Sequence, residues 1–60
     1  MKTSELLKIL KQYGCYFVRH AANHDIWHST INNREFPVPR HAGEVIKGTA
    51  EGILKQAGIK

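Results

Sequence analysis

Cysteine is almost absent from this sequence, since Cys15 is the only one. A single thiol cannot form an internal disulfide or a metal site built from cysteines alone. It begins the apolar run from Cys15 to Val18, a pattern typical of a buried structural thiol. Long apolar runs are also missing, although a helix that spans a bilayer needs roughly 20 such residues. Because the first residues lack the apolar core of a secretory signal, we expect a cytoplasmic protein without a membrane partner.

Acidic residues are few. Five Asp and Glu stand against nine Lys and Arg, which gives a formal net charge of +4. This balance favours an anionic partner, with nucleic acid first among the candidates, although a basic domain without such a partner would have the same charge. A chain of this length buries only about 60% of the surface that it exposes when unfolded. We therefore expect residues 1–60 to form one domain, with no room for a deeply enclosed cofactor.

Apolar spacing predicts a helix at the start of the chain. The residues of its apolar stripe, at i, i+3, i+4 and i+7, are Leu6, Ile9, Leu10 and Tyr13. Thr3 or Ser4 is expected to cap this helix, because their hydroxyls can accept from free N–H groups of the first turn. Gly14 is expected to end it, because glycine readily adopts the left-handed conformation that follows a helix.

Three short strands are predicted next. The expected positions are strands at 15–20, 24–30 and 35–39, joined by a turn at 21–23 and a loop at 31–34. Pro37 and Pro39 confine the third strand to an edge of the sheet, because proline has no N–H to donate. The sequence does not decide which side of the second strand faces the core, because Ile26 and Trp27 are both bulky and apolar.

A second helix is predicted near 48–57 and ends at Gly58. Its apolar face is expected to consist of Ile46, Ile53, Leu54 and Ala57. The resulting order, α-β-β-β-α, predicts an α+β fold: a three-stranded antiparallel sheet with two helices on one face. Double-stranded-RNA-binding domains have this topology.

Several segments point to one particular family with this topology. They are residues 1–7, Gly14, the turn that leads into His24, residues 38–41, Gly48 with Thr49, and residues 53–59. Taken in order and at this spacing, they resemble the HicA family of toxin ribonucleases over essentially the whole chain. The resemblance implies a toxin that cleaves messenger RNA independently of the ribosome, and a HicB-like antitoxin that neutralises it.

The same resemblance implies that His24 is catalytic, because it occupies the position of the family's essential histidine in a GSHH-like turn. This chain has Ala22 and Asn23 before that histidine, and Asp25 in place of a second one. RNA cleavage requires a 2′-OH to lose a proton and a 5′ oxygen to gain one. Since imidazole can exchange protons near neutral pH, His24 could serve as general base or acid, and we favour the base.

Other basic residues are candidates for RNA contacts. Arg19 could clamp a phosphate with its five donors, and His28 has the same strand parity as His24. Arg40 and His41 lie in the segment that resembles the family, where His41 could hold the loop or contact the backbone. Lys47 stands at the entrance of the second helix, which touches RNA in double-stranded-RNA-binding domains. His20 is a weaker candidate than Arg19.

Four histidines also raise the question of zinc. Their spacings of 4, 4 and 13 residues form no familiar finger pattern with the lone Cys15, so we expect no metal site and metal-independent cleavage. The main alternative function is a non-catalytic RNA-binding module of the same fold. A small DNA-binding regulator is disfavoured, because no helix-turn-helix spacing is present.

Overall fold

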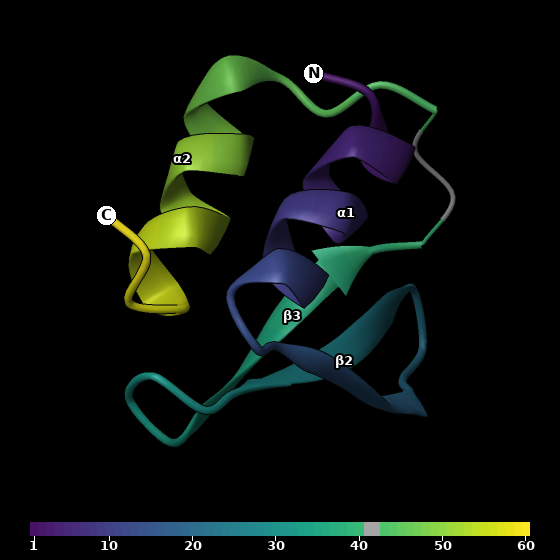
Figure 1. Cartoon of the computed structure of the whole chain (residues 1–60). Coiled ribbons are helices and arrows are strands. Elements are labelled where there is room, and N and C mark those ends of the chain that lie inside the picture. Colours follow the sequence, from purple (N-terminus) through teal and green to yellow (C-terminus); the bar gives the residue numbers. More distant parts are fainter. Residues whose placement is uncertain (41–42) are drawn as a thin grey trace.

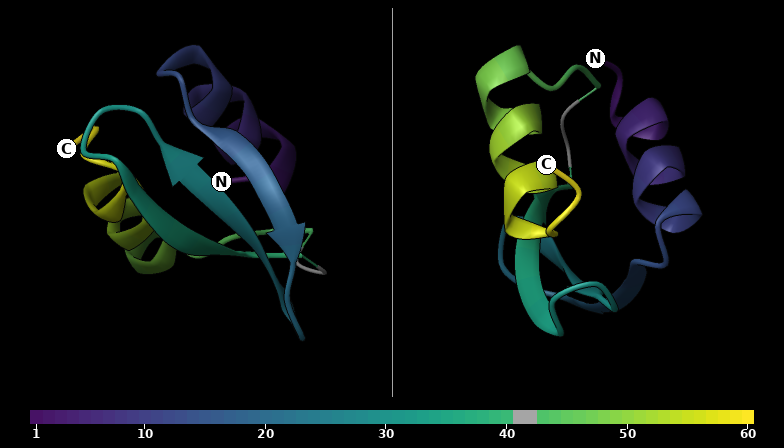
Figure 2. Two further views of the ribbon diagram at one scale, coloured as in Figure 1. Left: turned by 90° about the horizontal axis from the view of Figure 1, so that it is seen from below. Right: turned by 60° about the vertical axis from the view of Figure 1, so that its left-hand side comes forward.

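The computed structural model describes residues 1–40 and 43–60, and in these ranges it contains two helices and three strands. In chain order they are α1 (Thr3–Gln12), β1 (Tyr16–His20), β2 (His24–Ser29), β3 (Arg34–Pro39) and α2 (Lys47–Gln56). The strands form one antiparallel sheet in the order β1-β2-β3, and both helices lie on the same face of it (Figures 1 and 2). The predicted α-β-β-β-α fold is confirmed.

Helix α1 packs through the stripe that its spacing predicted, since Leu6 and Leu10 are fully buried. Tyr13 departs from the prediction: the helix ends at Gln12, and the Tyr13 side chain is 53% exposed. The predicted cap is also wrong, because the helix begins earlier. Lys2 is the N-cap residue, held in extended conformation where it pairs with Glu44.

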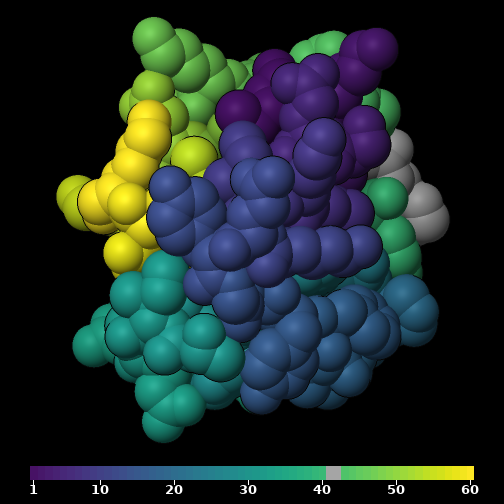
Figure 3. Space-filling view, viewed as in Figure 1, coloured from purple at the N-terminus to yellow at the C-terminus, as the bar shows by residue number. Residues whose placement is uncertain are grey.

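Gly14 ends α1 as predicted, with a φ of +87° that side chains rarely tolerate. A Cβ at this position would lie 2.6 Å from Thr30 Oγ1, so space as well as conformation demands glycine. The chain then enters β1 directly, and Cys15 is buried as expected. In the space-filling view, α1 and β1 together occupy the front of the molecule (Figure 3).

The parity of β2 is settled by burial. Trp27 is only 4% exposed and Ser29 is fully buried, so the odd-numbered residues face the helices. His24, Ile26 and His28 therefore lie on the opposite face of the sheet, which we call the outer face. Ser29 Oγ donates to Ala57 O at 2.6 Å, which ties the buried hydroxyl of β2 to the end of α2.

Strand β1 contains an irregularity that decides where its side chains point. Phe17 pairs with Trp27, whereas Arg19 pairs with Ile26, so the register shifts between them. Because of this bulge, Arg19 shares the outer face with Ile26 although Phe17 faces the helices. His20 returns to the helix side, where it pairs with Asp25.

Strand β3 lies at the edge of the sheet, as its prolines predicted. Pro37 and Pro39 pair with Ile26 and His24 on the outer face, while Phe36 and Val38 enter the core.

Helix α2 starts one residue before the predicted range and ends one residue before its end. Ile53, Leu54 and Ala57 are buried as expected, but Ile46 is 74% exposed. The prediction for Ile46 is wrong because this residue is the extended N-cap and precedes the helix, while Val45 fills the core instead.

The core lies between the sheet and the two helices. It consists of Leu6, Leu10, Cys15, Trp27, Phe36, Val38, Val45, Ala50, Ile53, Leu54 and Ala57. Within the ranges that the structure describes, neither helix is long and apolar enough to cross a bilayer.

Candidate active site

His24 is the first residue of β2 and follows the turn at 21–23. Its carbonyl accepts from Ala21 N–H at 2.8 Å, which closes the turn and fixes the backbone from which the imidazole projects. The side chain is exposed and makes no hydrogen bond with another residue of the described ranges. Its ring nitrogens are thus open to exchange a proton with a bound molecule.

This imidazole lines a shallow hollow of about 240 Å³ at the β3 edge of the sheet, where outer-face residues of β3 meet helix α2. Its lining residues are His24, Pro37, Pro39, Thr49, Gly52, Ile53 and Gln56. The four helical members recur at i, i+3, i+4 and i+7, which places them on one side of α2. Among the described residues that line this hollow, His24 is the one titratable group.

Arg19 is the predicted cation that the structure places on the same face as His24. The bulge in β1 brings it opposite Ile26, the next outer-face residue of β2 after His24. The side chain is exposed, so the guanidinium can reach a phosphate on this face.

His28 shares the outer face with His24, as its parity predicted, but lies two pleats away, about 13 Å along the strand. Its Nε2 lies 3.0 Å from Asn33 Oδ1, and its ring lies 5.2 Å from that of Tyr16. The structure therefore does not bring the two imidazoles together, and His28 is engaged with the loop after β2.

Arg40 and Asp25 brace the turn that carries His24. The Arg40 guanidinium donates to Ala22 O at 2.7 Å and lies 3.5 Å from Asp25 Oδ1. Asp25 Oδ1 also lies 2.6 Å from Nδ1 of His20. These contacts are on the helix side of the sheet, so Asp25 does not support the His24 imidazole, which points the other way.

Lys47 is the exposed first residue of α2. At about 100° per residue it lies on the side of the helix opposite Thr49 and Gly52, so the structure does not bring it into the hollow beside His24. His41 lies outside the described residues.

Sequence reasoning missed the walls of this site. Pro37 and Pro39 indicated an edge strand, and Pro39, Thr49 and Gln56 belonged to the segments that resemble the family. None of these signals predicted a wall beside His24, because that role depends on how α2 packs beside β3. The contact of His20 with Asp25 could have been found, because the two residues flank a short turn. Among the residues that the structure describes, no three potential ligands lie close enough to hold a metal ion.

Comparison with known proteins gives one result. Residues 3–59 match the family model of the HicA toxin of bacterial toxin–antitoxin systems. No curated protein and no solved structure matches the chain. The family match covers nearly the whole sequence and confirms the resemblance seen in its motifs. The chain therefore belongs to the HicA family and is the toxin of a toxin–antitoxin pair.

Proposed function

We infer that this toxin is an endoribonuclease that cleaves messenger RNA independently of the ribosome, with His24 as its proton-transfer group. The observation that carries the proposal is the His24 imidazole itself, which is exposed and lines the hollow between β3 and α2. Membership of the HicA family and the net charge of +4 support RNA as the target.

The reaction needs one proton removed and one delivered. As general base, His24 takes the proton of a ribose 2′-OH while the 2′ oxygen attacks the adjacent phosphorus. The bond from phosphorus to the 5′ oxygen then breaks, and that oxygen takes a proton from water. The products are a 2′,3′-cyclic phosphate and a 5′-hydroxyl end, and His24 later releases its proton to solvent.

Arg19 is suited to the charge that develops on the phosphate. Its guanidinium shares the outer face with His24, and cationic donors stabilise the extra negative charge of a five-coordinate phosphorus. No metal ion enters this mechanism. His28, Arg40 and Lys47 are proposed as RNA contacts only, with His28 and Arg40 also engaged in the contacts described above.

Expression in cells tests the proposal directly. The unaltered chain should arrest growth and fragment transcripts, whereas the His24→Ala protein should do neither at the same cellular level. Transcripts that stay intact while the unaltered chain arrests growth would instead favour the non-catalytic RNA-binding alternative.

A further inference from the structure

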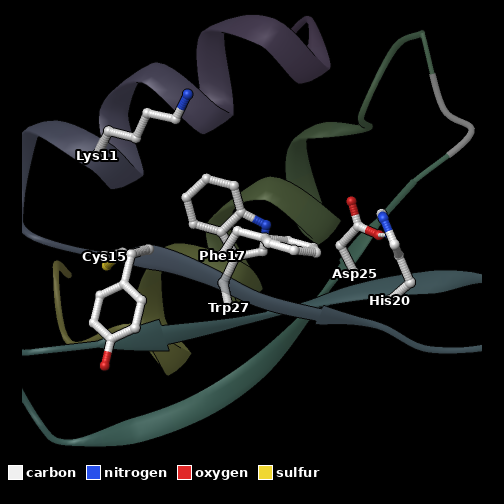
Figure 4. Close-up of a pocket in the computed structure, with 7 residues that line it drawn as sticks. Lys11, Cys15, Phe17, His20, Asp25 and Trp27 are labelled. Atoms are coloured by element: carbon white, nitrogen blue, oxygen red, sulfur yellow. Dashed lines mark hydrogen bonds and ion pairs between the residues drawn. The ribbon is translucent and has the colours of Figure 1, made fainter.

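A second hollow lies on the helix side of the sheet, between α1 and the β1–β2 hairpin. It measures about 510 Å³, within the size range of small-ligand sites. Its lining residues are Lys11, Cys15, Tyr16, Phe17, His20, Asp25 and Trp27 (Figure 4). We call it the hairpin pocket. It reaches the same β1–β2 turn as the candidate active site, because Asp25 lines the pocket and the adjacent His24 lines the other hollow.

Flat rings form the apolar part of this pocket. Trp27 is 4% exposed at its base, and Phe17, its cross-strand neighbour, is 44% exposed (Figure 4). The Phe17 ring also lies 4.9 Å from that of His20. An edge-strand aromatic ring that is nearly half exposed provides a surface on which another flat ring can stack.

The base of the pocket contains an unused donor. Trp27 Nε1 is buried and has no hydrogen-bond partner among the residues that the structure describes. Buried polar groups in proteins are nearly always paired, so an unpaired indole N–H points to an acceptor that a ligand would supply. Because this N–H is buried, binding requires the Phe17 side chain, 44% exposed on the edge strand, to shift so that an acceptor can approach.

Polar groups stand at the rim of the pocket. Because a carboxylate only accepts hydrogen bonds, His20 Nδ1 donates to Asp25 Oδ1, and this fixes the imidazole with Nε2 directed away from Asp25. Arg40, 3.5 Å from the same oxygen, offsets the charge of that carboxylate. Lys11 of α1 adds an ammonium group on the opposite wall (Figure 4).

We propose that the hairpin pocket binds one unpaired nucleotide of a single-stranded RNA substrate. The base stacks on Phe17, one of its acceptors pairs with Trp27 Nε1–H, and Lys11 contacts a neighbouring phosphate. This inference rests on the proposed function for its choice of RNA as the ligand. Strand geometry supports it, since His24 and Asp25 point to opposite faces at the end of the hairpin. An RNA strand that crosses this end would meet both sites.

RNA fits these groups better than an apolar side chain of a protein partner does. The rim carries Lys11 and the imidazole of His20, and the chain as a whole has a net charge of +4, which suits a polyanion. A purely apolar side chain would leave the Trp27 N–H unpaired, whereas every nucleobase offers both a flat face and ring or carbonyl acceptors.

Trp27 fluorescence provides the test, because it is the only tryptophan of the chain. The His24→Ala protein, in which the RNA should stay intact, is titrated with an eight-nucleotide single-stranded RNA. Binding should quench Trp27. Adding Phe17→Ala should weaken binding roughly tenfold, as expected for the loss of one stacked base. Val18→Ala is the matched control, since Val18 is an exposed apolar neighbour that does not line the pocket, and it should leave affinity unchanged.

Lys11→Gln serves as a second variant that does not alter the sheet, and it should lower affinity and flatten the salt dependence of binding. The proposal is overturned if Phe17→Ala and Lys11→Gln both bind RNA like their parent, or if an abasic oligonucleotide quenches Trp27 equally. Quenching by the antitoxin but not by RNA would assign the pocket to the protein partner and also overturn it. Cleavage by the unaltered chain is measured separately. If the chain does not cleave RNA but RNA still quenches Trp27 in a base-dependent way, the proposed nuclease function is wrong and the proposed nucleotide site stands.

Discussion

The Asp25 carboxylate lies 2.6 Å from the His20 imidazole and on the opposite face of the sheet from His24, its neighbour in sequence. The residue that stands in place of a second histidine therefore does not relay protons for His24. Instead it orients His20 and meets Arg40 near the turn. His24 has no such support within the described residues, so the proposed chemistry depends on this one imidazole.

Replacing His24 should remove cleavage and leave the fold intact. General acid–base catalysis contributes typically 10²–10⁴-fold, so the purified His24→Ala protein should cleave a transcript at least about 100-fold more slowly. RNA binding should persist, because phosphate contacts come from other residues. The measurement is the rate of transcript loss, with Glu35→Ala as control for an exposed outer-face residue away from the hollow. A folded His24→Ala protein that cleaves at the parental rate would refute the assignment.

Cleavage should not require a metal ion. The proposed mechanism uses an imidazole and water, so activity should be unchanged in EDTA. The products should carry 2′,3′-cyclic phosphate and 5′-hydroxyl ends, which the resistance of the 3′ ends to tailing and the ready phosphorylation of the 5′ ends by a kinase would reveal. Activity that disappears in chelator and returns with a divalent ion would contradict this mechanism.

Much of the fold could be predicted because local patterns decided it. The periodicity of α1 located Leu6 and Leu10 in the core, Gly14 marked the end of that helix, and the prolines marked the edge strand. These signals act over a few residues and depend little on the rest of the chain.

The remaining features depend on packing between distant segments. The bulge in β1 reverses the face of Arg19, yet nothing in the local sequence fixes a register shift there. The parity of β2 was undecidable because Ile26 and Trp27 are equally apolar, and only contact with the helices selects Trp27 for the core. The hollow around His24 likewise exists only because α2 lies beside β3.

Replacing either of two glycines by alanine should change the stability of the protein in opposite directions. Gly14→Ala should lower the free energy of unfolding by about 1–3 kcal/mol, because φ is +87° and the added Cβ would meet Thr30 Oγ1 at 2.6 Å. Gly48→Ala is the matched control. It is the second residue of α2 and has nothing within 4 Å of an added Cβ, so the change should raise stability by up to about 1 kcal/mol through helix propensity. Urea unfolding measures both free energies, and two variants that are each as stable as the parent protein would contradict both arguments.

The antitoxin should neutralise this toxin by covering His24. A potent nuclease must be inhibited in its own cell, and the exposed His24 imidazole, with Arg19 on the same face of the sheet, is the natural place to block it. We therefore predict a larger, acidic, HicB-like antitoxin that covers His24 and part of the surface formed by Arg19, Arg40 and Lys47. Binding at a basic surface should be fast at low salt and should weaken as ionic strength rises.

An antitoxin that covers His24 blocks access of RNA to the site as well as the reaction itself. The complex should therefore neither cleave nor bind RNA. Chemical modification of histidines, located by mass spectrometry, can follow His24 directly. Its imidazole should react in the free toxin, where it is exposed, and become protected in the complex. If His24 stays reactive in a fully inhibited complex, direct occlusion is wrong. Inhibition would then have to act by distorting the turn at 21–23, which Arg40 holds through Ala22 O.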